Sequence, residues 1–235
     1  MSAKLFHPTG TIPPVLTPSL LARLQDLNFD YLELAIAEHR DSQCPDPQRF
    51  PLKVAENLAG CSLEARQVLA RTSYSLYSLG FEDQHFWRKA LHPSERTLEV
   101  RYGREPVQTL RASFCELALI HAWHVAVTQP VAARMVYGMP QDVVQRMERV
   151  RLWQLKRIAA EYPGLLMPRW PTNPCFWPDL VRFARAGDQR RLATTQQLGH
   201  QLIAAELLAC ERPNSAARQR QRNLMVQQRL AGRRR

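Results

Sequence analysis

The feature that most constrains this fold is a series of apolar stripes at helical spacing, each ended by proline or glycine. The longest stripe runs from Val107 to Val127, and Pro130 and Gly138 bound the segment that follows it. Apolar side chains three and four residues apart line one face of a helix. Proline is accepted in a helix's first turn and glycine commonly ends a helix. The chain is therefore predicted to be all-α.

The same pattern predicts helices along most of the chain. They are expected from Leu20, then at 29–39, 52–58, 63–79, 82–91, 107–127, 131–137, 141–150, 152–161, 176–186 and 189–210. Ser62 is predicted as an N-cap, because its hydroxyl can accept a hydrogen bond from the first turn. Residues 1–17 are expected to be extended, residues 97–102 to form a strand, and residues 215–230 to form a basic helix.

A polar stretch with Gly103 and Pro106 separates two groups of predicted helices. It predicts a helical two-lobe protein with an N-terminal domain at 1–105 and a second helical domain at 106–211. A basic tail at 212–235 follows. No motif indicates a role for the N-terminal domain.

Positive charge is concentrated in the tail. The net charge is +11, no acidic residue follows Glu211, and the eight arginines after it contribute +8. Such a segment attracts polyanions, and nucleic acid is the commonest polyanion inside a cell. A solvated solubility tail and an anionic membrane surface are the alternatives. The predicted DNA contacts of the tail are Arg218, Arg220, Arg222, Arg229, Arg233, Arg234 and Arg235.

The motifs of common enzymes are missing. The chain contains no GxSxG, P-loop, GxGxxG or HExxH sequence, and none of its five cysteines forms a CxxC pair. His121 and His124 share a helix face, but two histidines without further evident ligands are more often structural. We therefore expect no catalysis, cofactor or metal. The N-terminus lacks the apolar stretch of a signal peptide and no run is long enough to span a membrane, so a cytoplasmic protein is predicted.

Residues 141–160 are predicted to form a helix-turn-helix-like unit. Its second helix would offer Arg151, Gln154, Lys156 and Arg157 to a DNA groove. A helical hairpin that only packs on the core explains the same pattern without DNA.

From about Phe114 to Leu208 the chain resembles the FlhD family, a subunit of the bacterial flagellar master transcription activator. Residues 116–138 look like the family's long helix, its short second helix and the glycine that closes it. Residues 150–159, with Gln154 at the centre, are similar to its leucine helix. The third stretch is a bend at Arg169-Trp170, then a helix, then Gly187-Asp188, Leu192, Gln197, Gly199, Leu202 and Leu207.

The resemblance implies an all-α homodimer of intertwined helices with a helix-turn-helix-like unit. It also implies an FlhC-like partner that supplies much of the DNA contact, and recruitment of RNA polymerase. The apolar stripes of the second half are wide enough to predict self-association. The predicted dimer interface comprises Leu110, Phe114, Leu117, His121, Val125, Val131 and Met135.

The chain departs from the family in three places. About 110 residues precede the match, the arginine tail follows it, and Leu166 stands where some FlhD proteins carry a cysteine that can bridge two subunits. These differences favour a relative of FlhD, such as a regulator on a mobile element, and put a covalent dimer in doubt. The alternative function is a non-enzymatic, helical protein-interaction subunit of a secretion apparatus.

Overall fold

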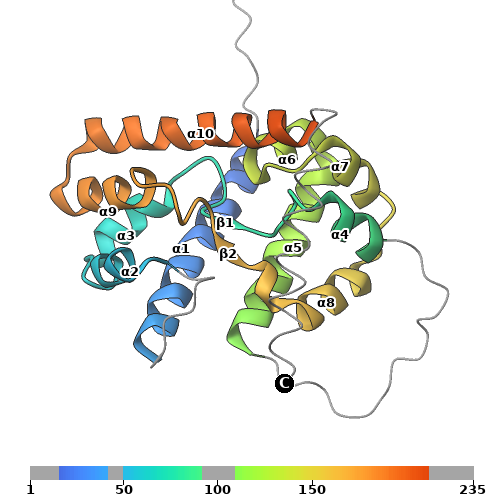
Figure 1. The fold of residues 1–235 in the computed structure, drawn as a ribbon, viewed down its shortest axis with the longest axis horizontal. Helices are drawn as coiled ribbons and strands as arrows, with labels where there is room; N and C mark the ends of the chain where they lie inside the picture. Colours follow the sequence, from blue (N-terminus) through green and yellow to red (C-terminus); the bar gives the residue numbers. More distant parts are fainter. Residues whose placement is uncertain (1–15, 42–49, 92–108, 212–235) are drawn as a thin grey trace, which may run out of the picture.

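The computed structural model describes residues 16–41, 50–91 and 109–211, and this part of the chain is built from helices. It contains ten α-helices, one short 3-10 helix and a two-stranded sheet (Figure 1), which confirms the all-α prediction. The elements, in chain order, are α1 (Pro18–Asp41), α2 (Leu52–Ala59), α3 (Leu63–Ala70), β1 (Tyr77–Ser78), α4 (Gln84–Ala90), α5 (Leu110–Thr128), α6 (Pro130–Tyr137), α7 (Gln141–Met147), α8 (Leu152–Glu161), η1 (Pro163–Leu165), β2 (Met167–Pro168), α9 (Phe176–Ala186) and α10 (Gln189–Glu211).

Most helix ends lie where side chains or glycines favour them. The Ser62 hydroxyl accepts a hydrogen bond from the Ala65 N–H at the start of α3, as predicted. Pro130 is the first residue of α6, and Gly138 ends that helix with φ 63°. Gly187 ends α9 in the same left-handed conformation, which glycine adopts without a steric cost.

Two helix predictions differ from the structure. The two stretches expected between residues 20 and 39 form one continuous helix, α1. The helix expected at 63–79 ends at Ala70. Beyond it, the hydroxyls of Thr72 and Ser75 donate hydrogen bonds to backbone carbonyls two residues later. Such local bonds compete with the helical pattern.

A buried asparagine holds this extended segment in place. The Asn28 amide of α1 donates to the Tyr74 carbonyl at 2.9 Å, and its Oδ1 accepts from the Leu76 N–H at 2.9 Å. The segment then forms β1, which pairs with β2 in antiparallel register, Tyr77 opposite Pro168. The predictions for residues 1–15, 97–102 and 215–230 concern parts of the chain outside the described residues.

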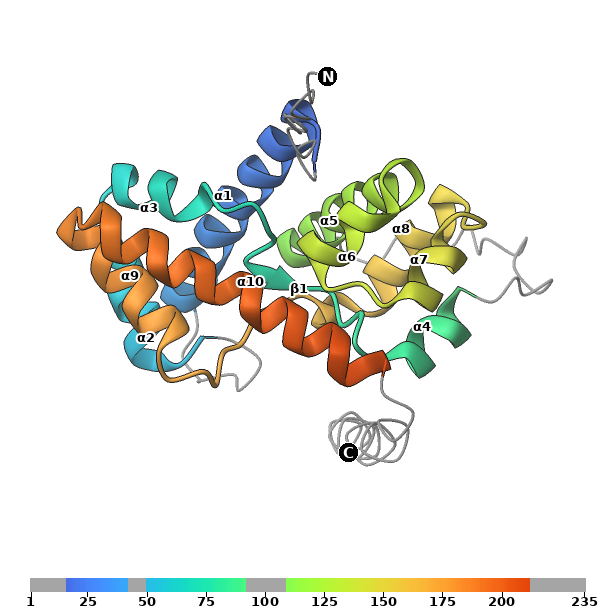
Figure 2. The same ribbon diagram turned by 90° about the horizontal axis from the view of Figure 1, so that it is seen from above.

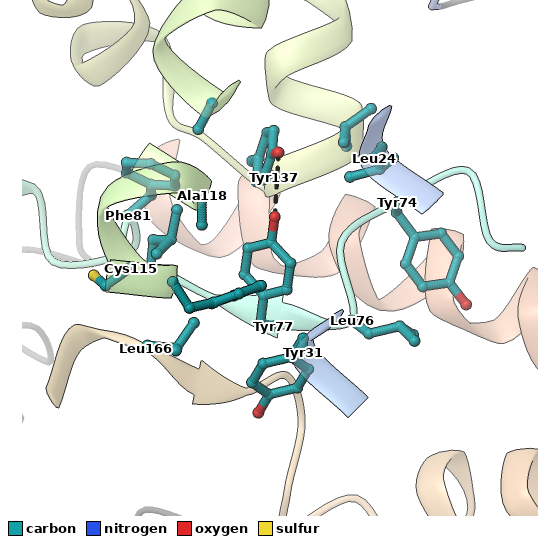
Figure 3. Packing of buried hydrophobic residues seen from close by; sticks show 14 of the residues in the cluster. Leu24, Tyr31, Tyr74, Leu76, Tyr77, Phe81, Cys115, Ala118, Tyr137 and Leu166 are labelled. Atoms are coloured by element: carbon teal, nitrogen blue, oxygen red, sulfur yellow. Dashed lines mark hydrogen bonds between the residues drawn. The ribbon is translucent and has the colours of Figure 1, made fainter. Parts of the chain in front are cut away.

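The two halves of the chain share one hydrophobic core. α1 packs on α5, α2 and α3 pack on α9, and α10 lies across both groups (Figures 1 and 2). At the centre, the Tyr77 ring lies 5.4 Å from both Tyr31 of α1 and Phe114 of α5, between centroids. Figure 3 shows Tyr77 directed toward Tyr137 of α6, with 3.5 Å between the two hydroxyl oxygens. The predicted boundary near residue 105 falls outside the described residues.

Candidate nucleic-acid and self-association surfaces

α7 and α8 follow each other in the chain, and each buries an apolar face against α5. Val143, Val144 and Met147 of α7 and Leu155 and Ile158 of α8 are all buried. Both helices pack on α5, and α7 also contacts α4. The unit predicted at 141–160 is therefore anchored to the core along one side and leaves the other side of α8 exposed.

The four predicted DNA contacts of α8 do not share one surface. Arg151 and Lys156 are exposed and Arg157 is half-buried. Gln154 is only 7% exposed, and its Oε1 accepts a hydrogen bond of 2.9 Å from the Arg151 backbone N–H. The amide of Gln154 therefore caps the helix from within, and the exposed face holds Arg151, Lys156 and, between them, Trp153, which is 43% exposed.

Arg157 is held by its neighbours along the helix. Its guanidinium carbon lies 5.6 Å from the centroid of the Trp153 ring, and its Nε lies 3.9 Å from a carboxylate oxygen of Glu161. A partly exposed pair at that separation contributes little to stability. The seven predicted arginines of the tail lie outside the described residues, which end at Glu211 on α10.

The predicted dimer residues divide between the core and the surface. Phe114 and Val125 are buried, at 6% and 0% exposed, and belong to the core of the subunit. Leu110, Leu117 and Val131 are 68%, 57% and 72% exposed. His121 and Met135 are half-buried.

The exposed apolar residues of α5 follow a different register from the predicted one. Along the outer face of the helix, successive residues of this face are three and then four positions apart in alternation, and the pattern continues to the first turn of α6. We call this face the α5 seam. It comprises the exposed Leu110, Leu117, Val127 and Val131 together with Ser113, Ile120 and His124, of which Ser113 and Ile120 are half-buried. Alternating spacings of this kind are the pattern by which one helix packs against another. The helix was predicted correctly from the sequence. The predicted interface, however, mixed residues of its inner and outer faces, because both faces are apolar.

The two histidines of α5 point to different places. The Nδ1 of His121 lies 2.6 Å from the Tyr137 hydroxyl, and burial lowers the pKa of His121 to about 4. His124 is exposed on the α5 seam. Within the described ranges, no group of three or more histidine, cysteine or acidic side chains lies in an arrangement suited to a metal ion. No described helix combines the length and apolar character needed to cross a membrane.

α10 carries a polar outer surface that sequence reasoning did not single out. Leu192, Gly199 and Ile203 face inward and are buried, and the Tyr74 hydroxyl donates to the Gln196 carbonyl at 3.1 Å. A groove of about 480 Å³ runs between α9 and α10. Its lining includes Asp179, Phe183, Arg191, Thr194, Gln197 and Gln201.

Two arginines lie against an aromatic ring of this groove. Arg182 and Arg191 stack on the Phe183 ring, 4.6 and 5.7 Å from its centroid. Arg182 pairs with Asp179 at 2.8 Å and Arg191 with Asp188 at 3.5 Å. The signal for this surface was in the sequence, since residues 189–205 contain no acidic residue, but only the packing shows which side chains face outward.

Comparison with known proteins gives no family for the chain: no family model matches it, and neither a curated protein nor a solved structure does.

Proposed function

We propose that this protein is a DNA-associated, FlhD-like transcription regulator that acts as a homodimer with an FlhC-like partner. The observation that carries the proposal is the distribution of charge. Eight of the eleven net positive charges follow Glu211. Exposed cations also occupy the turn between α7 and α8, at Arg149 and Arg151, and the exposed face of α8, at Lys156. Surfaces of this sign bind phosphates and release the counterions condensed on DNA.

The α5 seam supports the dimeric part of the proposal. Leu110, Leu117 and Val131 are large apolar side chains that a lone subunit leaves more than half exposed. Large apolar patches of this kind mark protein interfaces. The resemblance of residues 114–208 to FlhD adds the expectation of an FlhC-like partner and of RNA polymerase as the target of the complex.

The proposal is tested by the salt dependence of DNA binding. Purified full-length protein and a variant ending at Glu211 are titrated against a fluorescein-labelled promoter duplex at two salt concentrations. Each neutralised phosphate contributes about −0.9 to the slope of log K against log salt. We expect the truncated variant to bind more weakly and with a shallower slope.

An unchanged affinity and slope would remove the tail from the proposal. Absence of any binding by the full-length protein, with or without an FlhC-like protein, would contradict the function itself. The alternative, a subunit of a secretion apparatus, predicts co-purification with membrane complexes and no affinity for the duplex.

A further inference from the structure

We propose that α10 is the helix that enters the DNA major groove and that α8 supplies only flanking phosphate contacts. This inference rests on the proposed function, because it names which surface of the regulator meets the base pairs. Figure 1 shows α10 along one edge of the molecule, with the other labelled elements on its inner side. Figure 2, the view from above, shows its length lying in front of them.

Along the whole length of α10, the exposed residues lie on the opposite side of the helix from the buried ones. Leu192, Thr195, Gly199, Ile203 and Leu207 are buried and repeat every three or four residues. Between them, an exposed set faces solvent: Arg190, Ala193, Thr194, Gln197, Gln201, Ala204, Ala205 and, near the C-terminal end, Leu208, which is 60% exposed. We call this set the α10 face.

The side chains of the α10 face are of the types that read base edges. Arginine pairs with guanine, glutamine with adenine, and threonine and alanine contact the thymine methyl group. Arg190, Thr194, Gln197 and Gln201 supply the polar groups. The short alanines leave the backbone free to approach the bases closely. A groove about 12 Å wide admits a helix, and 23 residues at about 1.5 Å each span about 35 Å, close to one turn of the duplex.

The charge along this part of the chain also favours DNA. Between Gln189 and Arg235 the only acidic residues are Glu206 and Glu211. Both are neutralised by the body of the protein: Glu206 accepts hydrogen bonds of 2.6 Å from Arg169 and from the Trp170 indole, and Glu211 pairs with Arg134.

Ten arginines therefore follow Gln189 without a free carboxylate to repel phosphates: Arg190, Arg191 and the eight of the tail. The tail begins in the sequence at the residue after α10. A helix in the groove and a basic segment along the adjacent backbone would contact the same duplex.

α8 offers less to a base pair. It has ten residues, its glutamine is buried as a cap, and the exposed side chains of its first turn are Leu152 and Trp153. Arg151 and Lys156 remain as two exposed cations suited to phosphates, which fix position and carry no sequence information.

Photo-crosslinking separates the two helices. The full-length chain is prepared with Gln197→p-benzoylphenylalanine on α10, or with Ala160→p-benzoylphenylalanine on the exposed face of α8 as the matched control. Each is bound to a labelled 40-bp duplex pool of random sequence and irradiated. We expect the major protein–DNA adduct from position 197 and a weaker one from position 160, because α8 would meet only the phosphate backbone beside the groove.

A triple variant tests the same surface without a probe. Arg190→Ala, Gln197→Ala and Gln201→Ala together should weaken duplex binding roughly tenfold or more, because base and phosphate contacts are lost. The circular dichroism spectrum should stay helical, since all three side chains are exposed. The paired substitutions Arg151→Ala and Lys156→Ala on α8 should cost less affinity.

The outcomes separate the inference from the function. Duplex binding with adducts from position 160 alone, with adducts from neither position, or with unchanged affinity of the triple variant would overturn the role of α10 and leave the function standing. A triple variant that alters the oligomeric mass but not DNA binding would make the α10 face a protein interface. Failure of the unmodified protein to bind any duplex would overturn both.

Discussion

Gly138 lies where the end of α6 meets a buried ion pair. Arg169 is 3% exposed, and its guanidinium donates to the Val136 carbonyl at 3.1 Å and to Glu206 at 2.6 Å. The backbone of Gly138 is left-handed, with φ 63°. A Cβ at this position would stand 2.5 Å from the Arg169 Nη2 and 3.1 Å from the Glu206 carboxylate. The absent side chain is therefore what allows the bend before α9 to close onto α10.

Replacing this glycine tests the closure. Gly138→Ala should destabilise the fold by about 3 kcal/mol or more, because a strained backbone adds about 1–2 kcal/mol to the cost of displacing a buried arginine from its partners. Gly187→Ala is the matched control, since Gly187 has the same φ sign and nothing within 4 Å of its Cβ position. It should cost only the backbone strain. Urea denaturation measures both, and equal losses would show that the Arg169 contact does not matter.

At the scale of elements, α5 serves two surfaces at once. Its inner face reaches the core through Phe114 and Val125, which are buried, while its outer face forms the α5 seam. A helix that is apolar all round is expected to be covered on all sides. The described residues cover only the inner face, which is why the proposed function has a second copy of the chain cover the outer one.

One lysine on the seam should separate the copies. Leu117→Lys places a charge where Leu117, 57% exposed in the subunit, would be buried by the second copy. Self-association should weaken roughly 1000-fold, because the two copies together lose about 4 kcal/mol, roughly 2 kcal/mol for each leucine that is no longer buried. Sedimentation should then give the 27.1 kDa mass of one chain at concentrations where the unmodified protein has twice that mass.

Leu63→Lys is the control for this substitution. Leu63 is 54% exposed on α3, away from the seam, so its variant should sediment like the unmodified protein. If the unmodified protein itself has the mass of one chain at every concentration, the seam does not pair.

At the scale of the whole molecule, one core holds the described parts together. β1 from the first half pairs with β2 from the second half, and the ring of Phe50, which precedes α2, meets the Trp177 ring of α9 at 4.5 Å between centroids. Asn28 of α1 fixes the segment that leads into β1. The strand pair and the Phe50–Trp177 contact each need residues from both halves of the chain. The Asn28 contacts lie within the first half.

The shared core predicts how the protein unfolds. We expect a single calorimetric transition, with equal calorimetric and van't Hoff enthalpies, because disrupting either half exposes apolar surface of the other. Residues in α1 and α9 should lose protection from hydrogen exchange together. Two separate transitions would instead support the division at residue 105 that was predicted from the sequence.

Local signals in the sequence determined the helical class and most helix ends. Ser62, Pro130, Gly138 and Gly187 act within a few residues of themselves, through a hydroxyl acceptor, a missing N–H or a left-handed backbone, so their effects can be predicted without a fold. The same holds for the charge of the tail, which is a property of composition.

Only the tertiary structure decided which faces are buried. Besides the local bonds of its hydroxyls, the segment after α3 is held by Asn28, which bonds Ala70 and three residues beyond it, 42 to 48 positions away, and no local pattern reports such a partner. The burial of Gln154 and the inward position of Phe114 follow from how α5 and α8 pack. Helical periodicity identifies an apolar face, but which of two such faces is covered depends on segments far away in the chain.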